Sequence, residues 1–219
     1  MEIEGGSEVL NIVQNIISRL INFPLFFSFN FLFLQNRYLL PALTIFKCNP
    51  GVVTELWLVL QELDCKTRYF IYNELMTINQ YSNLILIENF GISLKEINKW
   101  LKRLAKDKIK HNARTLGKLS HNNPTIVFNE IIKSIKSYPN QIVPMIGALN
   151  YSSNLSLDIT MFLILRHISD PSKDKLKQND ANLEGWFLNI SNFAGLFLKK
   201  NHNVLYLKKT IKYKNNSII

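Results

Sequence analysis

Cysteine is scarce in this sequence of 219 residues, which contains only Cys48 and Cys65. Two thiols so far apart form neither a disulfide framework nor the Cys-x-x-Cys pair of a zinc site. The four histidines share no ligand spacing with these cysteines, so we expect no metal and no other cofactor. This cysteine usage favours a reducing compartment.

The sequence also lacks a secretory signal and a long apolar run. Its first eight residues are acidic where a signal peptide needs positive charge, so the four Asn-x-Ser matches are not expected to carry glycans. Six of the eleven residues from Phe23 to Phe33 are phenylalanine. Pro24 and several polar residues interrupt this tract well below the roughly 20 apolar residues of a transmembrane helix. We therefore expect no membrane span and no membrane partner.

Catalytic motifs are equally sparse. Gly117 to Ser120 resembles part of a phosphate-binding loop, but Asn112 stands where the first glycine belongs and Leu119 replaces the hydroxyl residue after the lysine. Ser120 and His121 are adjacent, which supplies neither converging side chains nor an orienting acid. We expect no enzyme activity and no small-molecule substrate.

Apolar residues at helical spacing dominate what the sequence does contain. The segments with this spacing are Val9–Ile21, Val52–Leu63, Arg68–Ile78, Ser93–Ile109, Thr125–Ile135, Ile142–Leu149, Leu155–Ile168 and Leu183–Leu198. The run Leu84–Ile87 is short enough for a strand, but its position between helices is more typical of a buried helical turn or connector. Helices of this length with short links predict an all-α fold, in which antiparallel helical hairpins stack as an irregular α-solenoid of the HEAT or ARM type.

Positive charge is concentrated in one segment of a chain whose formal net charge is +10. Ser93 and Glu96 have the spacing of a capping box, which predicts that a helix begins there. On a helical wheel, five lysines of this segment share one face, an arginine flanks them, and two more cations follow. The candidate binding residues are Lys95, Lys99, Lys102, Arg103, Lys106, Lys110, Arg114 and Lys118. We predict that they bind an RNA backbone or an acidic protein segment, with a solvated helix face as the alternative.

A polar run from Gly117 to Pro124 follows the basic segment. Asn123 is predicted to cap the next helix, with Pro124 at its first position. Ser120 and His121 are expected to bond to nearby backbone, which would make the run a rigid elbow between antiparallel helices. A partner contact is the alternative for this run.

Blocks of residues along the chain carry a further signal. The most specific block is Leu116–Phe128, which follows Leu101–Lys110 and Arg114. Weaker blocks are Leu39–Leu43, Glu55–Trp57, Arg68–Tyr72, Pro144–Leu149, Asp170–Pro171 and Asp180–Lys200. Together they resemble the THO complex subunit 2 family over about three quarters of this chain, which is a small piece of family members several times longer.

This resemblance implies a nuclear scaffold subunit of the THO/TREX complex, acting in mRNA processing and in mRNA export coupled to transcription. The implied partners are the other THO complex subunits and a DEAD-box RNA helicase, with mRNA as a further partner. Two hypotheses therefore stand together. The chain is a scaffold segment without chemistry of its own, or a helical RNA-binding module that uses the basic helix face.

Both ends of the chain depart from the family pattern. Residues 1–47 combine a predicted N-terminal helix with a Phe-rich insert at about residues 23–35. Phenylalanine, leucine and serine are what a pyrimidine-rich DNA tract encodes, so the insert suggests a retained intron or a mis-set exon boundary. Residues 48–200 are expected to form the helical solenoid segment. Residues 201–219 are expected to form a basic, disordered, low-complexity tail, whose composition suggests AT-rich sequence read past an exon.

Overall fold

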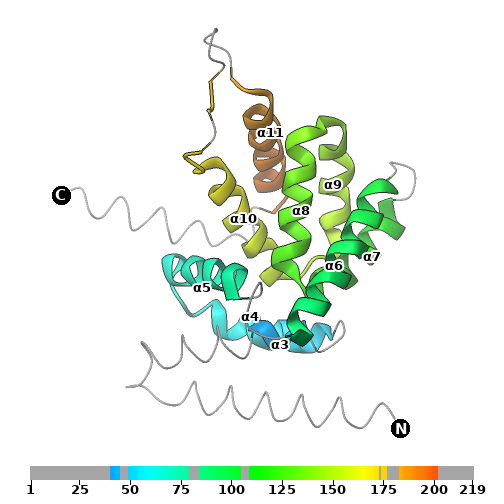
Figure 1. Cartoon of the computed structure of the whole chain (residues 1–219), viewed down its shortest axis with the longest axis vertical. Helices are drawn as coiled ribbons and strands as arrows, with labels where there is room; N and C mark the ends of the chain where they lie inside the picture. The colour runs from blue at the N-terminus through cyan, green and yellow to red at the C-terminus, as the bar shows by residue number, and fades with distance from the viewer. Residues whose placement is uncertain are drawn as a thin grey trace, which may run out of the picture.

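The computed structural model describes residues 40–44, 49–78, 84–104, 109–172, 174–176 and 183–201. The helices in chain order are α3 (Leu40–Ala42), α4 (Pro50–Leu60), α5 (Cys65–Ile78), α6 (Leu84–Lys102), α7 (Ile109–Asn122), α8 (Pro124–Ser137), η3 (Pro139–Gln141), α9 (Ile142–Ala148), η4 (Leu149–Tyr151), α10 (Asn154–Ile168) and α11 (Gly185–Lys200). Within those ranges, the only strand-like pairing is one antiparallel bridge between Leu176 and Leu183. The predicted all-α fold is thus confirmed (Figure 1). The predicted helix Val9–Ile21, the Phe-rich insert and the tail after residue 201 lie outside the described residues.

Helix α8 lies at the centre of the molecule, where it packs against α5, α6, α7, α10 and α11 (Figure 1). Its apolar residues recur every three or four positions, and Phe128, Ile131 and Ile135 are completely buried. The helix begins at Pro124, whose missing N–H would have no partner in the first turn. It ends at Ser137, because Tyr138 is extended before Pro139, a position from which proline sterically excludes helical backbone.

The helices around α8 form antiparallel hairpins. The indole of Trp100 on α6 donates to the carbonyl of Asn112 on α7, whereas Ser93, earlier on α6, bonds to Asn123 after the end of α7. The earlier residue of α6 thus meets the later residue beside α7, so these two helices run in opposite directions. Helices α6 and α8 run in the same direction, since Phe90 and Ile126 line one groove and later residues of both helices line another.

A buried charge pair joins α5 to α10. The guanidinium of Arg68 donates to the carboxylate of Asp158 at 2.9 and 3.4 Å, and both side chains are less than a tenth exposed. The hydroxyl of Tyr72 donates to the same carboxylate at 2.9 Å. Burial raises the pKa of Tyr72 well above its usual value, and the charge of Asp158 raises it further, so this hydroxyl stays protonated as a donor. Arg68 also donates to the carbonyl of Leu63, which ties the α4–α5 link to the network.

The start of α6 corrects one prediction. The helix begins at Leu84 rather than Ser93, so the Ser93 and Glu96 pair is not a capping box. Ser93 is buried within the helix, and its hydroxyl accepts a hydrogen bond from the side chain of Asn123 at 2.6 Å. The segment from Leu84 is helical as expected, but Leu84 and Ile85 are exposed rather than buried. The hydroxyl of Ser93 bonds to a residue of another segment rather than to the backbone of its own helix, and the local sequence does not reveal that partner.

The predicted polar turn from Gly117 to Pro124 is also wrong. Helix α7 continues to Asn122, and Asn123 alone separates it from α8. Gly117 is tolerated inside the helix because the backbone of η4 approaches it closely, so that an added Cβ would lie 2.9 Å from the carbonyl oxygen of Tyr151. Asn123 precedes Pro124 as predicted, but its side chain makes no capping bond. It donates a hydrogen bond to the hydroxyl of Ser93 instead.

We predict that Asp158→Ala lowers the free energy of unfolding by about 3–5 kcal/mol, because Arg68 would remain buried without its counter-charge. The matched control is Glu130→Ala, which breaks the Glu130–Lys133 ion pair, where the lysine side chain is 56% exposed. That change should cost no more than about 1 kcal/mol. Urea denaturation of the two variants measures both values, and equal losses would contradict the structural role of the buried pair.

A double-mutant cycle tests the bond between Ser93 and Asn123. Asn123→Ala should cost about 1–3 kcal/mol, because it leaves a buried hydroxyl without its donor. Adding Ser93→Ala should cost less than the sum of the two single changes, since both partners are then absent. Strictly additive losses in thermal denaturation would mean that the two side chains do not stabilise one another.

Candidate functional site

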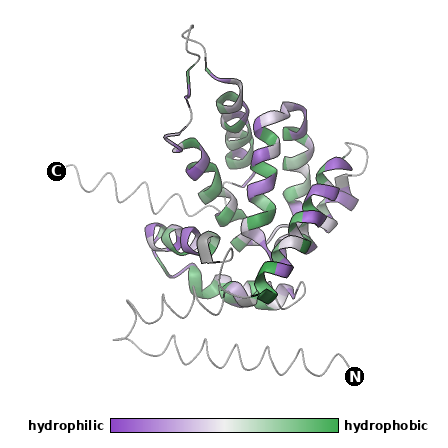
Figure 2. Ribbon diagram, in the orientation of Figure 1, coloured by the Kyte–Doolittle hydropathy of each residue, from purple (hydrophilic) through white to green (hydrophobic). Residues whose placement is uncertain are grey.

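Most of the predicted binding residues lie in the described part of the chain and are exposed. They are Lys95, Lys99, Lys102, Arg103, Lys110, Arg114 and Lys118, which we call the basic surface. Lys106 lies outside the described residues. Figure 2 shows hydrophilic residues along α6 and α7 at the edge of the molecule, while hydrophobic residues gather where the helices pack on α8.

The basic surface is built from two helices, which corrects the prediction of one helix reaching Ile109. Helix α6 ends at Lys102 and α7 begins at Ile109. Lys110 therefore belongs to α7 rather than to the face that Lys95 and Lys99 share.

A groove of about 690 Å³ between α6 and α7, the α6–α7 groove, brings cations of both helices together. Lys99 lines it from α6, Arg103 from the turn directly after α6, and Lys118 from α7. Trp100 also lines the groove; it is only 6% exposed, and its indole N–H donates to the carbonyl of Asn112 at 3.2 Å. This bond holds the two walls of the groove together. Glu96 supplies a carboxylate at the rim, so cations exceed acidic groups by three to one, not counting His111.

Helix stability explains only part of this charge. Lys99 and Lys102 lie in the last turn of α6, where the helix dipole favours positive charge by about 0.3–1 kcal/mol each. Lys110 lies at the start of α7, where the dipole disfavours a cation, and no acidic residue compensates it in that turn. Lys110 is therefore placed against local helix stability, so the stability of α7 does not account for its charge.

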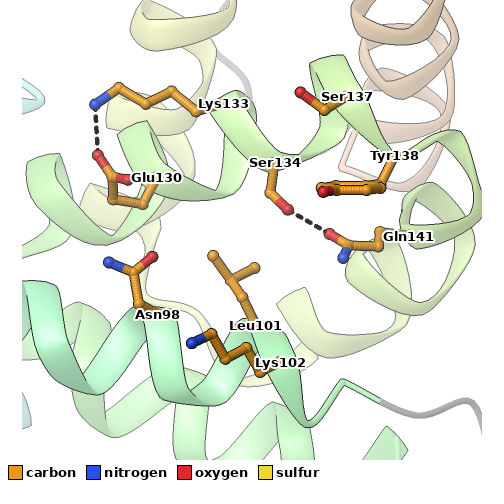
Figure 3. A pocket seen from close by; sticks show the side chains of 9 residues that line it. All are labelled: Asn98, Leu101, Lys102, Glu130, Lys133, Ser134, Ser137, Tyr138 and Gln141. Carbon is orange, nitrogen blue, oxygen red and sulfur yellow. Dashed lines mark hydrogen bonds and ion pairs between the residues drawn. The ribbon is translucent and has the colours of Figure 1, made fainter.

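Lys102 lies apart from the α6–α7 groove. It lines a second groove of about 450 Å³ between α6 and α8, the α6–α8 groove, together with Asn98, Tyr138 and Gln141 (Figure 3). The sequence analysis missed these three polar residues, since pairing α6 with α8 requires the tertiary structure. The one available signal was an aromatic residue directly before Pro139, at the point where the apolar stripe of α8 ends.

His121, in the last turn of α7, has an unusual environment. Its Nδ1 atom is buried without a hydrogen-bond partner in the described part of the chain, so the expected bond to nearby backbone is not made by this atom. The neighbouring prediction is confirmed, because the hydroxyl of Ser120 donates to the carbonyl of Gly117 at 2.9 Å. Burial lowers the pKa of His121 below its usual value of 6.5, so the ring favours its neutral form.

Within the described residues, no group of three or more His, Cys, Asp or Glu side chains is arranged to hold a metal ion. None of the helices in those ranges combines the length and hydropathy needed to cross a membrane.

Stacked helical hairpins around a central helix, with an exposed cationic surface on one hairpin, define an all-α protein of the solenoid-like class. Two family models match the chain: residues 30–114 match the THO complex subunit 2 N-terminus, and residues 116–191 match a transcription- and export-related complex subunit. The chain belongs to the THO complex subunit 2 family.

Curated relatives of that name come from distant eukaryotes. The human THO complex subunit 2 is 30% identical over 167 residues, which cover 76% of this chain and 10% of the relative. The Arabidopsis thaliana protein is 32% identical over 162 residues, or 74% of this chain and 9% of the relative. The Saccharomyces cerevisiae protein is 25% identical over 189 residues, which cover 84% of this chain and 12% of the relative. The chain thus spans about a tenth of the length of the curated relatives it matches.

The lowered pKa of His121 predicts a pH dependence of stability. The unfolded chain takes up a proton at about pH 6.5, whereas the folded chain takes it up only at lower pH. The free energy of unfolding should therefore fall as the pH drops below about 6.5, until the folded-state pKa is reached.

Urea denaturation of the parent and of His121→Gln between pH 7.5 and 5 would measure this contribution. The substitution should reduce the slope of stability against pH, because glutamine does not titrate. His111→Gln, at an exposed position on the same helix, is the matched control and should leave the slope unchanged. Identical slopes for His121→Gln and the parent would contradict the assignment.

Proposed function

We propose that this chain is a segment of a nuclear scaffold subunit of the THO/TREX complex, which acts in mRNA processing and in mRNA export coupled to transcription. In this proposal residues 48–200 form the helical segment that holds other THO complex subunits in place. A DEAD-box RNA helicase and mRNA are the further partners of the assembly. The segment contributes surfaces rather than catalysis.

The observation that carries this proposal is the family match, which extends through nearly all the described helices. A match confined to one helix would reflect composition, whereas this one spans α3 to the first turns of α11. An all-helical stack with extended side surfaces is the architecture from which many scaffold proteins are built. The family that residues 116–191 match is described as a transcription- and export-related complex subunit, which supports the process that we propose.

Affinity capture tests the scaffold role. The tagged 219-residue chain is expressed in cells of its own organism and captured from a nuclear extract. It should retain the other THO complex subunits after a wash at 150 mM salt and treatment with ribonuclease. Retention after ribonuclease treatment would support direct protein contacts. Recovery of no THO subunit under these conditions would count against the scaffold role of this segment.

The basic surface supports a second candidate function, direct RNA binding. Lys99, Arg103 and Lys118 converge on one groove, and the charge of Lys110 at the start of α7 is not explained by helix stability. Neutralising RNA phosphates releases counterions, so the affinity should depend strongly on salt. About five phosphate contacts predict a slope near −3.5 in a plot of log K against log salt on single strands.

We predict that changing Lys99, Arg103 and Lys118 together to Glu weakens RNA binding, and does so more at 50 mM than at 300 mM salt. Losing three phosphate contacts should bring the slope to about −1.4. Fluorescence anisotropy of a labelled single-stranded RNA at several salt concentrations measures both quantities.

The matched control changes Lys66, Lys175 and Lys199 to Glu. These residues are also exposed but lie outside both grooves, and the change in net charge is the same. This control should bind RNA more tightly than the variant with Lys99, Arg103 and Lys118 changed to Glu, and its salt slope should be closer to that of the parent. Equal weakening of the two variants would mean that total charge, rather than the α6–α7 groove, determines binding.

A further inference from the structure

The α6–α8 groove contains a set of groups different from the basic surface. Figure 3 shows side chains that reach into it from α6, from the end of α8 and from η3. Of the charged residues that line it, Lys133 is paired with Glu130 at 2.6 Å, so Lys102 supplies its net positive charge. The volume of about 450 Å³ lies within the usual range for small-molecule sites, which is roughly 300–1,000 Å³.

Tyr138 presents an aromatic ring to this groove. The residue is 57% exposed, although a tyrosine of a globular protein is commonly more buried. Its backbone is fixed, because its N–H donates to the carbonyl of Ser134 at 2.9 Å and its carbonyl accepts from the amide of Gln141 at 3.1 Å. Pro139 restricts it further. An exposed ring on a rigid corner loses little conformational entropy when a flat ligand stacks on it.

One side-chain amide, that of Gln141, lies next to this ring, and a second, that of Asn98, lies farther along the groove (Figure 3). The hydroxyl of Ser134 donates to Oε1 of Gln141 at 2.6 Å, which orients the amide and leaves its NH₂ group as a donor. Asn98 lines the groove from α6, opposite α8 (Figure 3). Amides carry both donors and acceptors, which are the groups that read the edge of an unpaired nucleobase.

We propose that the α6–α8 groove is a binding site for one unstacked base of single-stranded RNA. The base stacks on Tyr138, the amide of Gln141 bonds to its edge, and Lys102 contacts the adjoining phosphate. This site rests on the RNA-binding function proposed above, because Lys102 also belongs to the basic surface and gives an RNA strand a continuous path over α6. An acidic peptide fits less well, since one net cation offers it little and the exposed ring and amides would contribute nothing specific.

Anisotropy of a labelled 12-residue oligouridylate with the full chain tests the site. Tyr138→Ala should weaken binding about fivefold to a hundredfold, the range expected for loss of one base stack. The salt slope should stay that of the parent, because tyrosine contacts no phosphate. Tyr138→Phe keeps the ring and should bind within about twofold of the parent. Tyr151→Ala, which removes another tyrosine that is 50% exposed, is the matched control and should bind like the parent.

Three outcomes would overturn the site. The first is that Tyr138→Ala binds as tightly as the parent while the triple Glu variant of the α6–α7 groove binds more weakly. In that case no base occupies the α6–α8 groove, yet the RNA-binding function stands. If the parent itself fails to bind oligouridylate at 50 mM salt, the site and the RNA-binding function both fail. If an oligoglutamate peptide of equal charge displaces the RNA as effectively as unlabelled oligouridylate, the surface binds acidic chains without recognising bases.

Discussion

The burial of α8 is the constraint on which the rest of the structure depends. A helix with apolar residues on so much of its circumference must be covered on several sides, and five other helices supply that cover. Completely burying a residue such as Phe128 is worth several kcal/mol, as large-to-small substitutions in cores show. Helix α6 is positioned by this packing, and α7 follows it as the returning arm of a hairpin. The outward faces of these two helices, which carry the cations, are therefore fixed indirectly by the apolar residues of α8.

Sequence reasoning succeeded where a helix has a continuous apolar stripe. The stripes in α8 and α10 predicted those helices within about two residues at each end, because burial and periodicity agree there. It failed for α7, whose polar residues, Gly117 and two successive asparagines indicate a turn. The compensating contact is the backbone of Tyr151 against Gly117, which no local pattern contains. It also misread Ser93, because a serine three residues before a glutamate looks the same whether it caps a helix or bonds to another helix.

The candidate site was predictable in composition but not in arrangement. The residue types and the exposure of the basic surface follow from its charge, since Lys and Arg rarely lie in cores. How these residues share two grooves depends on where α6 ends and on which helix packs beside it. Tyr138 shows this limit most clearly. In the sequence it is one more aromatic residue at the end of an apolar stripe, and only its place opposite Asn98 and Lys102 separates it from the core.

The contacts between α5 and α10 have a consequence for how the chain folds. Arg68 meets Asp158, and Met76 meets Arg166, so each pair is separated by 90 residues and the two helices run in the same direction. At the usual rate of synthesis, on the order of ten seconds pass between the appearance of Arg68 and that of its partner. The helices α6 to α9 emerge in that interval and have time to form their hairpins first. Helix α10 can join the fold only after that interval, and α11 follows it. A chaperone that shields the apolar side of α5 would act during that delay.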